Sequence, residues 1–260
     1  MPNYVKKLEK IISLVELNLK KLSNSPEPES LHDYRTSFRR LQAAMACLPR
    51  SIREKMRLQR YISSRKKVFK STTKIRDLDI ISERLAAYDS IAASELIKKI
   101  QSRRRVQTSD LVRRAKRASE KSQPNVGGKT LDKANLSKRS GKVVARLRSQ
   151  LIREIPLNAT DPNSEEVHRF RKDAKNFRYT LEYVGMFPEL EKTLRIWQKQ
   201  LGETRDAQVT LEFLSKSENL EGLDEIVTNQ TRSERENYDA FRQSVKDASI
   251  LLQKENISRS

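Results

Sequence analysis

The chain has 260 residues, of which 36% are apolar and 34% are charged, and its net charge is +20 at neutral pH. Six glycines and eight prolines are too few for the many turns of a β-rich fold, so the composition favours helices. The single cysteine excludes an intrachain disulfide framework, and no apolar run approaches the length of a membrane span. We therefore expect a cytoplasmic protein that does not enter a membrane.

Apolar residues in the first half recur at spacings of three and four, which predicts a series of amphipathic helices. The expected helices run from about residue 5 to 22, from Ser30 as N-cap to Leu48, from Ser51 toward Thr73, from Arg76 to Ser90, and from Ser94 to Ser119. The apolar face of the second helix consists of Leu31, Tyr34, Phe38, Leu41, Met45 and Leu48.

Residues 120–141 contain Pro124 and half of the chain's six glycines, which predicts a linker. The helical pattern then resumes. Helices are expected from Val143 to Ile155, over 167–184, around Leu194 and Leu201 with Gly202 as the end, over Arg205–Leu214, and over about Leu223–Leu252. The sequence thus predicts one 260-residue domain with a first half at 1–119 and a second half at 142–260.

The two halves share motifs, which indicates an internal repeat. His32-x-x-Arg35-x-x-x-Arg39 corresponds to His168-x-x-Arg171-x-x-x-Lys175, and Arg76-Asp77 corresponds to Arg205-Asp206. The motifs contain both histidines of the chain. Each Asp is expected either to cap the start of a helix or to orient a neighbouring Arg by an ion pair.

Each histidine begins a cationic stripe that helical periodicity separates from the apolar face. Stacked cations destabilise a bare helix, so these stripes are expected to meet an external anion. Nucleic acid is one such anion. Single-strand binders, however, interleave aromatic residues with basic ones, and here the aromatic residues fall on the apolar faces, with Tyr179 near a stripe edge as the exception. The pattern therefore favours inorganic polyphosphate, which offers charge without bases.

Catalytic motifs are weak in this sequence. Gly127-Gly128-Lys129-Thr130 is similar to the end of a P-loop, but Gln123 stands where the first glycine is needed and no strand precedes it. The two histidines are poor metal ligands because neighbouring Arg and Lys residues oppose a cation. We expect no enzymatic activity, no cofactor and no metal site.

Four segments in order resemble the CHAD family, the histidine α-helical domains: the stretches that begin at His32, Ile75, Val167 and Leu201. The resemblance implies two four-helix bundle halves related by a pseudo-twofold axis, with a basic cavity or channel between them that binds polyphosphate without catalysis. Relatives fused to a CYTH triphosphatase domain have a Glu-x-Glu-x-Lys signature. Glu234-Arg235-Glu236 is followed here by Asn237 and Tyr238, so a stand-alone CHAD domain is expected.

The expected partner is inorganic polyphosphate, and the expected location is the cytoplasm, at polyphosphate granules. Weaker nucleic-acid binding and contacts with proteins of phosphate metabolism are further expectations. A nucleic-acid-binding protein and a granule-associated scaffold or regulator stay open as alternatives. The residues expected to contact the polyanion are His32, Arg35, Arg39, Arg40, Arg53, Arg57, Arg60, Lys67, Lys74, Arg76, Arg103, His168, Arg171, Lys175, Arg178 and Arg205.

Overall fold

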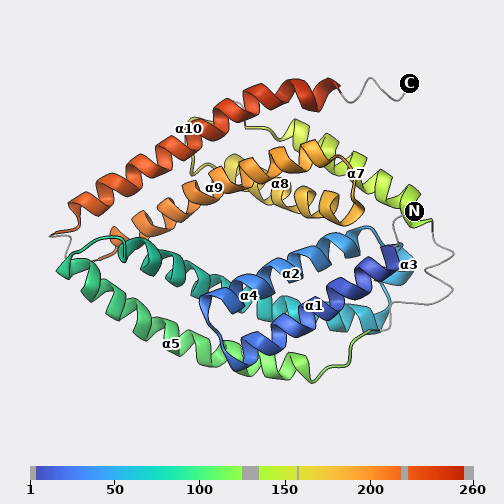
Figure 1. Ribbon diagram of the computed structural model, residues 1–260, viewed down its shortest axis with the longest axis horizontal. Coiled ribbons are helices and arrows are strands. Elements are labelled where there is room, and N and C mark those ends of the chain that lie inside the picture. Colours follow the sequence, from blue (N-terminus) through green and yellow to red (C-terminus); the bar gives the residue numbers. More distant parts are fainter. Residues whose placement is uncertain (1–3, 125–134, 157, 218–221, 255–260) are drawn as a thin grey trace. The chain divides into compact units, whose positions relative to one another are not determined.

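The computed structural model describes residues 4–124, 135–156, 158–217 and 222–254, with side chains up to Lys246. Within these ranges every secondary-structure element is a helix, which confirms the all-α prediction (Figure 1). The helices are α1 (Tyr4–Asn24), α2 (Pro28–Ala46), α3 (Arg50–Arg53), α4 (Met56–Leu85), α5 (Ile91–Ser119), α7 (Leu136–Arg153), α8 (Glu165–Val184), α9 (Pro188–Leu214) and α10 (Asp224–Lys254). None of the described helices is long and apolar enough to cross a membrane.

The chain forms two compact units. The first contains residues 1–79, 98–144 and 183–185, and the second contains 80–97, 145–182 and 186–260. The pseudo-twofold relation and the basic cavity between halves stay predictions. Residues 125–134, which include part of the expected linker and the P-loop-like segment Gly127–Thr130, lie outside the described residues.

The core of the first unit forms where α1 packs along α2 and both contact α4. All six residues predicted for the apolar face of α2 are buried, as are Leu8, Ile12, Val15, Leu19 and Leu22 of α1. Tyr34 stacks on Phe38 with ring centroids 6.2 Å apart, and Phe38 meets Phe69 at 5.2 Å. These contacts fix the rotation of α2 about its axis and therefore the direction of its cationic stripe.

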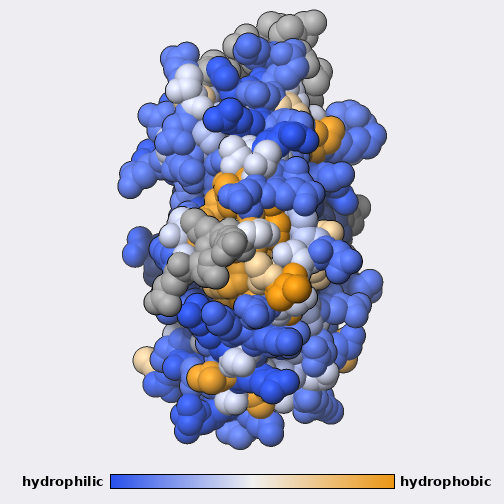
Figure 2. Space-filling view, turned by 90° about the vertical axis from the view of Figure 1, so that its left-hand side faces the viewer, coloured by the Kyte–Doolittle hydropathy of each residue, from blue (hydrophilic) through white to orange (hydrophobic). Residues whose placement is uncertain are grey.

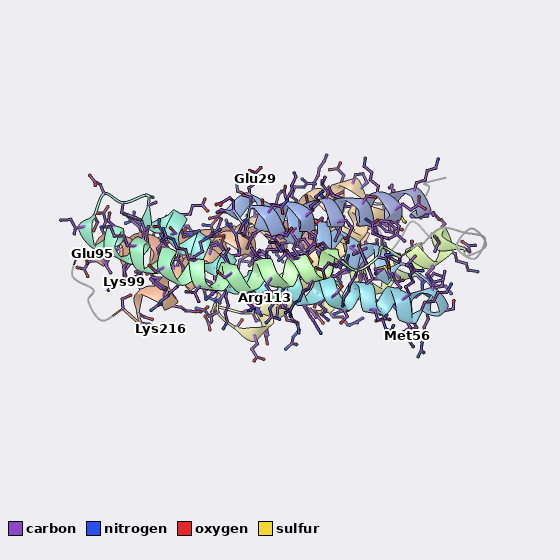
Figure 3. The ribbon with its side chains drawn as sticks, turned by 90° about the horizontal axis from the view of Figure 1, so that it is seen from below. Glu29, Met56, Glu95, Lys99, Arg113 and Lys216 are labelled. Atoms are coloured by element: carbon purple, nitrogen blue, oxygen red, sulfur yellow. The ribbon has the colours of Figure 1, made fainter. Side chains whose placement is uncertain are left out.

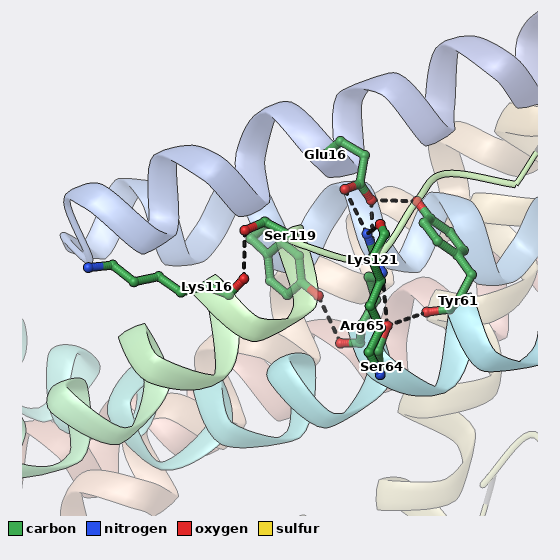
Figure 4. A network of polar contacts seen from close by, with 8 residues as sticks. Glu16, Tyr61, Ser64, Arg65, Lys116, Ser119 and Lys121 are labelled. Carbon is green, nitrogen blue, oxygen red and sulfur yellow. Dashed lines mark hydrogen bonds and ion pairs between the residues drawn. The ribbon is translucent and has the colours of Figure 1, made fainter.

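A buried charge network ties α1 to α4 within the first unit (Figure 4). The Arg65 side chain is fully buried, and its Nη2 and Nε donate to the Glu16 carboxylate at 2.8 and 3.0 Å. The Tyr61 hydroxyl donates to the same carboxylate at 2.6 Å, and Arg65 Nη2 also donates to the carbonyl of Lys121 at 3.2 Å. Burial, followed by the contacts with Glu16, raises the pKa of Tyr61 far above its ordinary value, so the phenol stays protonated and a donor.

The core of the second unit is an aromatic cluster on α8, α9 and α10. Phe170 lies 5.7 Å from Trp197 and 5.6 Å from Phe241, measured between ring centroids. Tyr238 stacks on Phe241, and its hydroxyl donates to the carbonyl of Ala159 at 2.9 Å. All six residues predicted for the apolar face of α8 (Val167, Phe170, Ala174, Phe177, Leu181 and Val184) are buried. This packing turns the adjacent face of α8, with His168, toward solvent.

Several predicted helix ends are wrong. The helix expected to end near Thr73 continues through Arg76 as α4, and the helix expected to end at Gly202 continues as α9. A glycine inside a helix costs about 1 kcal/mol, which the burial of Leu201 and Thr204 beside it outweighs. Ser30 lies inside the first turn of α2, whose N-cap is Glu27, and α7 begins at Leu136 rather than at Val143.

Candidate anion-binding site

A pocket of about 600 Å³ in the second unit lies against the first turns of α8 and the middle of α9. Its lining consists of Pro162, Asn163, Glu165, Val167, His168, Arg169, Arg171, Lys172, Leu201, Thr204, Arg205, Gln208 and Glu212. Five of these residues are basic or histidine, two are acidic, and none is Phe, Tyr or Trp. The volume is in the range of ligand-binding pockets, about 300–1,000 Å³. The pocket therefore offers a mostly cationic wall without a surface on which bases stack.

The N-terminus of α8 positions the histidine of this wall, His168. Ser164 acts as a cap: its Oγ accepts from the Val167 N–H at 3.4 Å, and its carbonyl accepts from the His168 N–H at 3.1 Å. Glu165 and Glu166 occupy the first turn, where a negative charge favours the helix. With Val167 buried, the next residue, His168, points toward the pocket together with Arg171 and Lys172 one turn later.

Helix α9 supplies the opposite wall through Arg205. Its Nη1 donates to Glu212 Oε1 at 2.9 Å, two turns further along the helix, and lies 3.5 Å from Gln208 Oε1. Gln208 Nε2 in turn donates to Glu234 Oε1 of α10 at 2.9 Å, which ties α9 to α10 beneath the pocket. Asp206 and its equivalent Asp77 lie inside α9 and α4, so helix capping, one of the two roles expected for them, is wrong.

The pKa of His168 is lowered below its ordinary value of 6.5, first by burial and then by Lys172, Arg171 and Arg205, with Glu165 opposing them. Nearby on α8, burial and the neighbouring Glu154 raise the pKa of Asp173 to about 6. The free pocket is therefore predicted to hold a neutral imidazole at neutral pH, and the raised pKa of Asp173 adds a second titrating group to the same helix.

The first unit contains the repeat-related group around His32. Burial, Arg76, Arg39 and Arg35 lower the pKa of His32, while Asp33 raises it, so these residues lie close enough to act on the imidazole. Arg35 Nη1 donates to the hydroxyl of Thr72 at 2.9 Å, and its guanidinium lies 4.9 Å from the centre of the Phe69 ring. The group around His32 thus combines the cationic stripe predicted on α2 with residues of α4.

Other predicted residues neither line the pocket nor are among those that act on His32. Arg53 belongs to α3 rather than to the long helix that contains Arg60 and Lys67. Lys67 and Arg76 are nine residues apart, about half a turn out of phase on α4, so they face opposite sides. Arg57, Arg60, Lys67, Lys74 and Arg103 are all exposed.

The exposed face of α5 illustrates the surroundings of one of these residues, Arg103. Arg103 lies between Lys99 and Arg113 on α5, along which charged side chains extend into solvent (Figure 3). Hydrophilic residues also dominate the face seen in Figure 2. Such a surface is typical of a solvated helix face, so the pocket and the His32 group are the better-defined sites.

Arg178 is 6% exposed, although the sequence predicts a contact with the polyanion. Its Nε donates to Gln198 Oε1 at 2.7 Å, Nη1 lies 3.4 Å from Glu182, and the guanidinium covers the ring of Tyr179 at 4.1 Å. Tyr179 itself is 4% exposed, so the aromatic residue expected at the stripe edge is covered. Arg40 and Lys175 are half-buried and do not line the pocket.

Sequence reasoning missed Arg169, Lys172 and Glu212 in the pocket lining. Lys172 follows His168 by four residues, so helical spacing alone could have added it to the stripe. Glu212 follows Arg205 by seven residues within the helix predicted over Arg205–Leu214, so the same spacing could have placed both on one face. No comparable signal identifies Arg169, whose position depends on how α8 packs.

Comparisons with known proteins agree with this architecture. A family model described as the CHAD domain matches residues 7–188. Among solved structures, the crystal structure of the CHAD domain from the plant Ricinus communis matches with a TM-score of 0.62 and 17% identity, over 94% of this chain and 90% of that one. No curated protein sequence matches the chain. Because the family model matches more than half of its residues, the chain belongs to the CHAD domain family.

Proposed function

We propose that the protein binds inorganic polyphosphate, through the pocket on α8 and α9 and through the group around His32. The observation that supports this most is the pocket lining, in which His168, Arg171 and Arg205 are joined by two further basic residues without Phe, Tyr or Trp. Several cations at one wall suit an anion that presents several phosphates at once.

The covered aromatic residues favour polyphosphate over single-stranded nucleic acid. Binders of single strands need exposed rings, on each of which a stacked base contributes about 1–3 kcal/mol. Here the guanidinium of Arg178 covers Tyr179, and those of Arg35 and Arg39 lie 4.9 and 5.5 Å from the centre of the Phe69 ring. Recognition at these two sites would therefore depend on phosphate charge.

The proposal assigns no catalytic step. The hydroxyl in the pocket lining belongs to Thr204, and it donates to the Gln200 carbonyl at 3.0 Å, so it is held away from a role as nucleophile. Binding alone would suit a cytoplasmic protein that associates with polyphosphate granules or regulates a protein of phosphate metabolism.

Competition binding tests the proposal. Fluorescent long-chain polyphosphate would be titrated with the wild type, and unlabelled single-stranded RNA and orthophosphate would compete at equal phosphate concentration. We expect polyphosphate to bind more tightly than RNA and far more tightly than orthophosphate. Displacement of polyphosphate by an equal concentration of RNA phosphate would instead identify a nucleic-acid binder.

A variant pair locates the site. Arg171→Ala should weaken polyphosphate binding about tenfold, the loss of one charge-assisted contact of about 1.5 kcal/mol. Arg195→Ala is the matched control, because Arg195 is an exposed arginine paired with Glu191 on α9 and does not line the pocket. Equal losses in both variants would mean that general charge, and not this pocket, binds the ligand.

A further inference from the structure

The pocket already contains an anion of the protein's own. Arg205 and Glu212 both line it, and their ion pair spans 2.9 Å between Nη1 and Oε1. The two side chains are 32% and 53% exposed, so the pair borders solvent. Exposed pairs of this kind are weak, and a stronger anion can open them.

The first unit does not repeat this arrangement. Arg76 corresponds to Arg205 in the repeated motif and acts on His32 as Arg205 acts on His168. Among the residues that the structure describes, however, no ion pair joins Arg76 to a carboxylate. The internal anion is thus a feature of the second unit and not a requirement of the shared motif.

Gln208 keeps Arg205 at the pocket wall independently of the ion pair. Its Oε1 lies 3.5 Å from Arg205 Nη1, and its Nε2 is fixed by Glu234 at 2.9 Å. Displacement of Glu212 would therefore leave the guanidinium with its contact to Gln208 at the pocket wall. Glu212 lies near the end of α9, where its exposed side chain can turn outward without disturbing the core.

We propose, on the basis of the proposed polyphosphate function, that Glu212 is an internal carboxylate that the ligand must displace from Arg205. Glu212 thereby sets the ligand concentration at which this pocket is occupied. A ligand that contacts one cation exchanges one ion pair for another and gains little. A condensed phosphate chain displaces Glu212 once and gains contacts with His168 and Arg171 as well. The pocket therefore stays unoccupied by orthophosphate and by small carboxylates at concentrations at which polyphosphate binds.

The affinity of any anion that uses Arg205 is reduced by the fraction of time for which Glu212 occupies it. Glu212→Gln removes the competing charge and keeps the shape of the side chain. We expect this variant to bind polyphosphate about two- to fivefold more tightly than the wild type, the range that corresponds to an exposed ion pair. Isothermal titration calorimetry would measure both affinities at the same salt concentration.

Glu191→Gln is the matched control for charge. Glu191 is also on α9 and pairs with Arg195 at 2.8 Å, but neither residue lines the pocket. Glu191→Gln changes the net charge by the same amount as Glu212→Gln. Because Glu191 does not line the pocket, this substitution should leave the affinity for polyphosphate nearly unchanged. Equal affinities of Glu212→Gln and Glu191→Gln would overturn the inference.

The second test combines Glu212→Gln with Arg205→Ala. Because Glu212 acts through Arg205, the gain should disappear when the guanidinium is absent. A gain that persists in the Arg205→Ala background would show long-range repulsion rather than displacement, and would also overturn the inference. In both cases the proposed function stands as long as the wild type binds polyphosphate, whereas a wild type that binds none overturns the proposed function itself.

Discussion

The two histidines have similar electrostatic surroundings in the two units. Each is followed on its own helix by an arginine at the third position, and each lies near the arginine of an Arg-Asp pair. Burial and these cations lower both pKa values below 6.5. A bound polyanion would do the opposite, because a nearby negative charge favours the imidazolium form.

Polyphosphate affinity should therefore increase as the pH falls. Each histidine has a lower pKa in the free protein than in the complex, so binding takes up protons in the pH window between the two values. Affinity measured from pH 5.5 to 8.5 should rise toward the acidic end in the wild type. The control is the double variant His32→Gln with His168→Gln, which retains Asp173, a group that titrates at about pH 6. If the double variant has the same pH profile, the histidines have a structural role at the helix starts.

Residue spacing predicts only part of these sites. The stripes on α2 and α8 follow from helical periodicity, so His32, Arg35, His168 and Arg171 could be located without a structure. The burial of Arg178 could not, because it depends on Gln198 of another helix. Spacing also cannot show that guanidinium groups cover Tyr179 and Phe69, since this depends on side-chain conformation and, for Phe69, on how α2 packs against α4.

At the scale of helices, the sequence was least informative about where long helices continue. The sequence predicts boundaries near Arg76 and at Gly202, yet α4 passes through the first and α9 through the second. Local propensity differs by at most about 1 kcal/mol per residue, so packing along a helix overrides it. The consequence for the site is direct, because the uninterrupted α9 joins Leu201 of the pocket lining to Thr204 and Arg205 in one helix.

The network of Arg65 on α4 and Glu16 on α1 leads to a prediction about stability. Glu16→Gln would leave the fully buried Arg65 guanidinium without its counter-charge. Because Arg65 is 0% and Glu16 is 13% exposed, solvent screens the pair little. We expect the free energy of unfolding to fall by about 3–5 kcal/mol, the usual cost of an uncompensated buried charge. Urea denaturation would measure it.

The control for this variant is Glu54→Gln. Glu54 pairs with Arg50 at 2.7 Å, but the two side chains are 54% and 80% exposed. This substitution should change the denaturation midpoint very little. A similarly small effect of Glu16→Gln would mean that the carbonyl of Lys121 and nearby hydroxyl groups are sufficient to satisfy Arg65.

For the whole molecule, the net charge of +20 predicts a strong dependence of binding on salt. Several basic side chains that engage phosphates together release the counterions of the polyanion, so the logarithm of affinity should fall steeply with the logarithm of salt concentration. Removal of one contact with Arg171→Ala should reduce the slope by about one unit, whereas Arg195→Ala should not. An affinity that does not depend on salt would exclude this electrostatic mechanism.

The chain has one cysteine and one tryptophan, and they belong to different units. Cys47 is buried in the first unit, and burial raises the pKa of its thiol, so a thiol reagent reaches it only when this unit opens. Trp197 is fully buried beside Phe170 and Phe241 in the second, so its fluorescence responds to loss of that core. The native chain thus contains a separate optical or chemical reporter for each unit. Labelling of Cys47 and emission of Trp197, followed along one denaturant series, would show whether the two units unfold as one cooperative body or in succession.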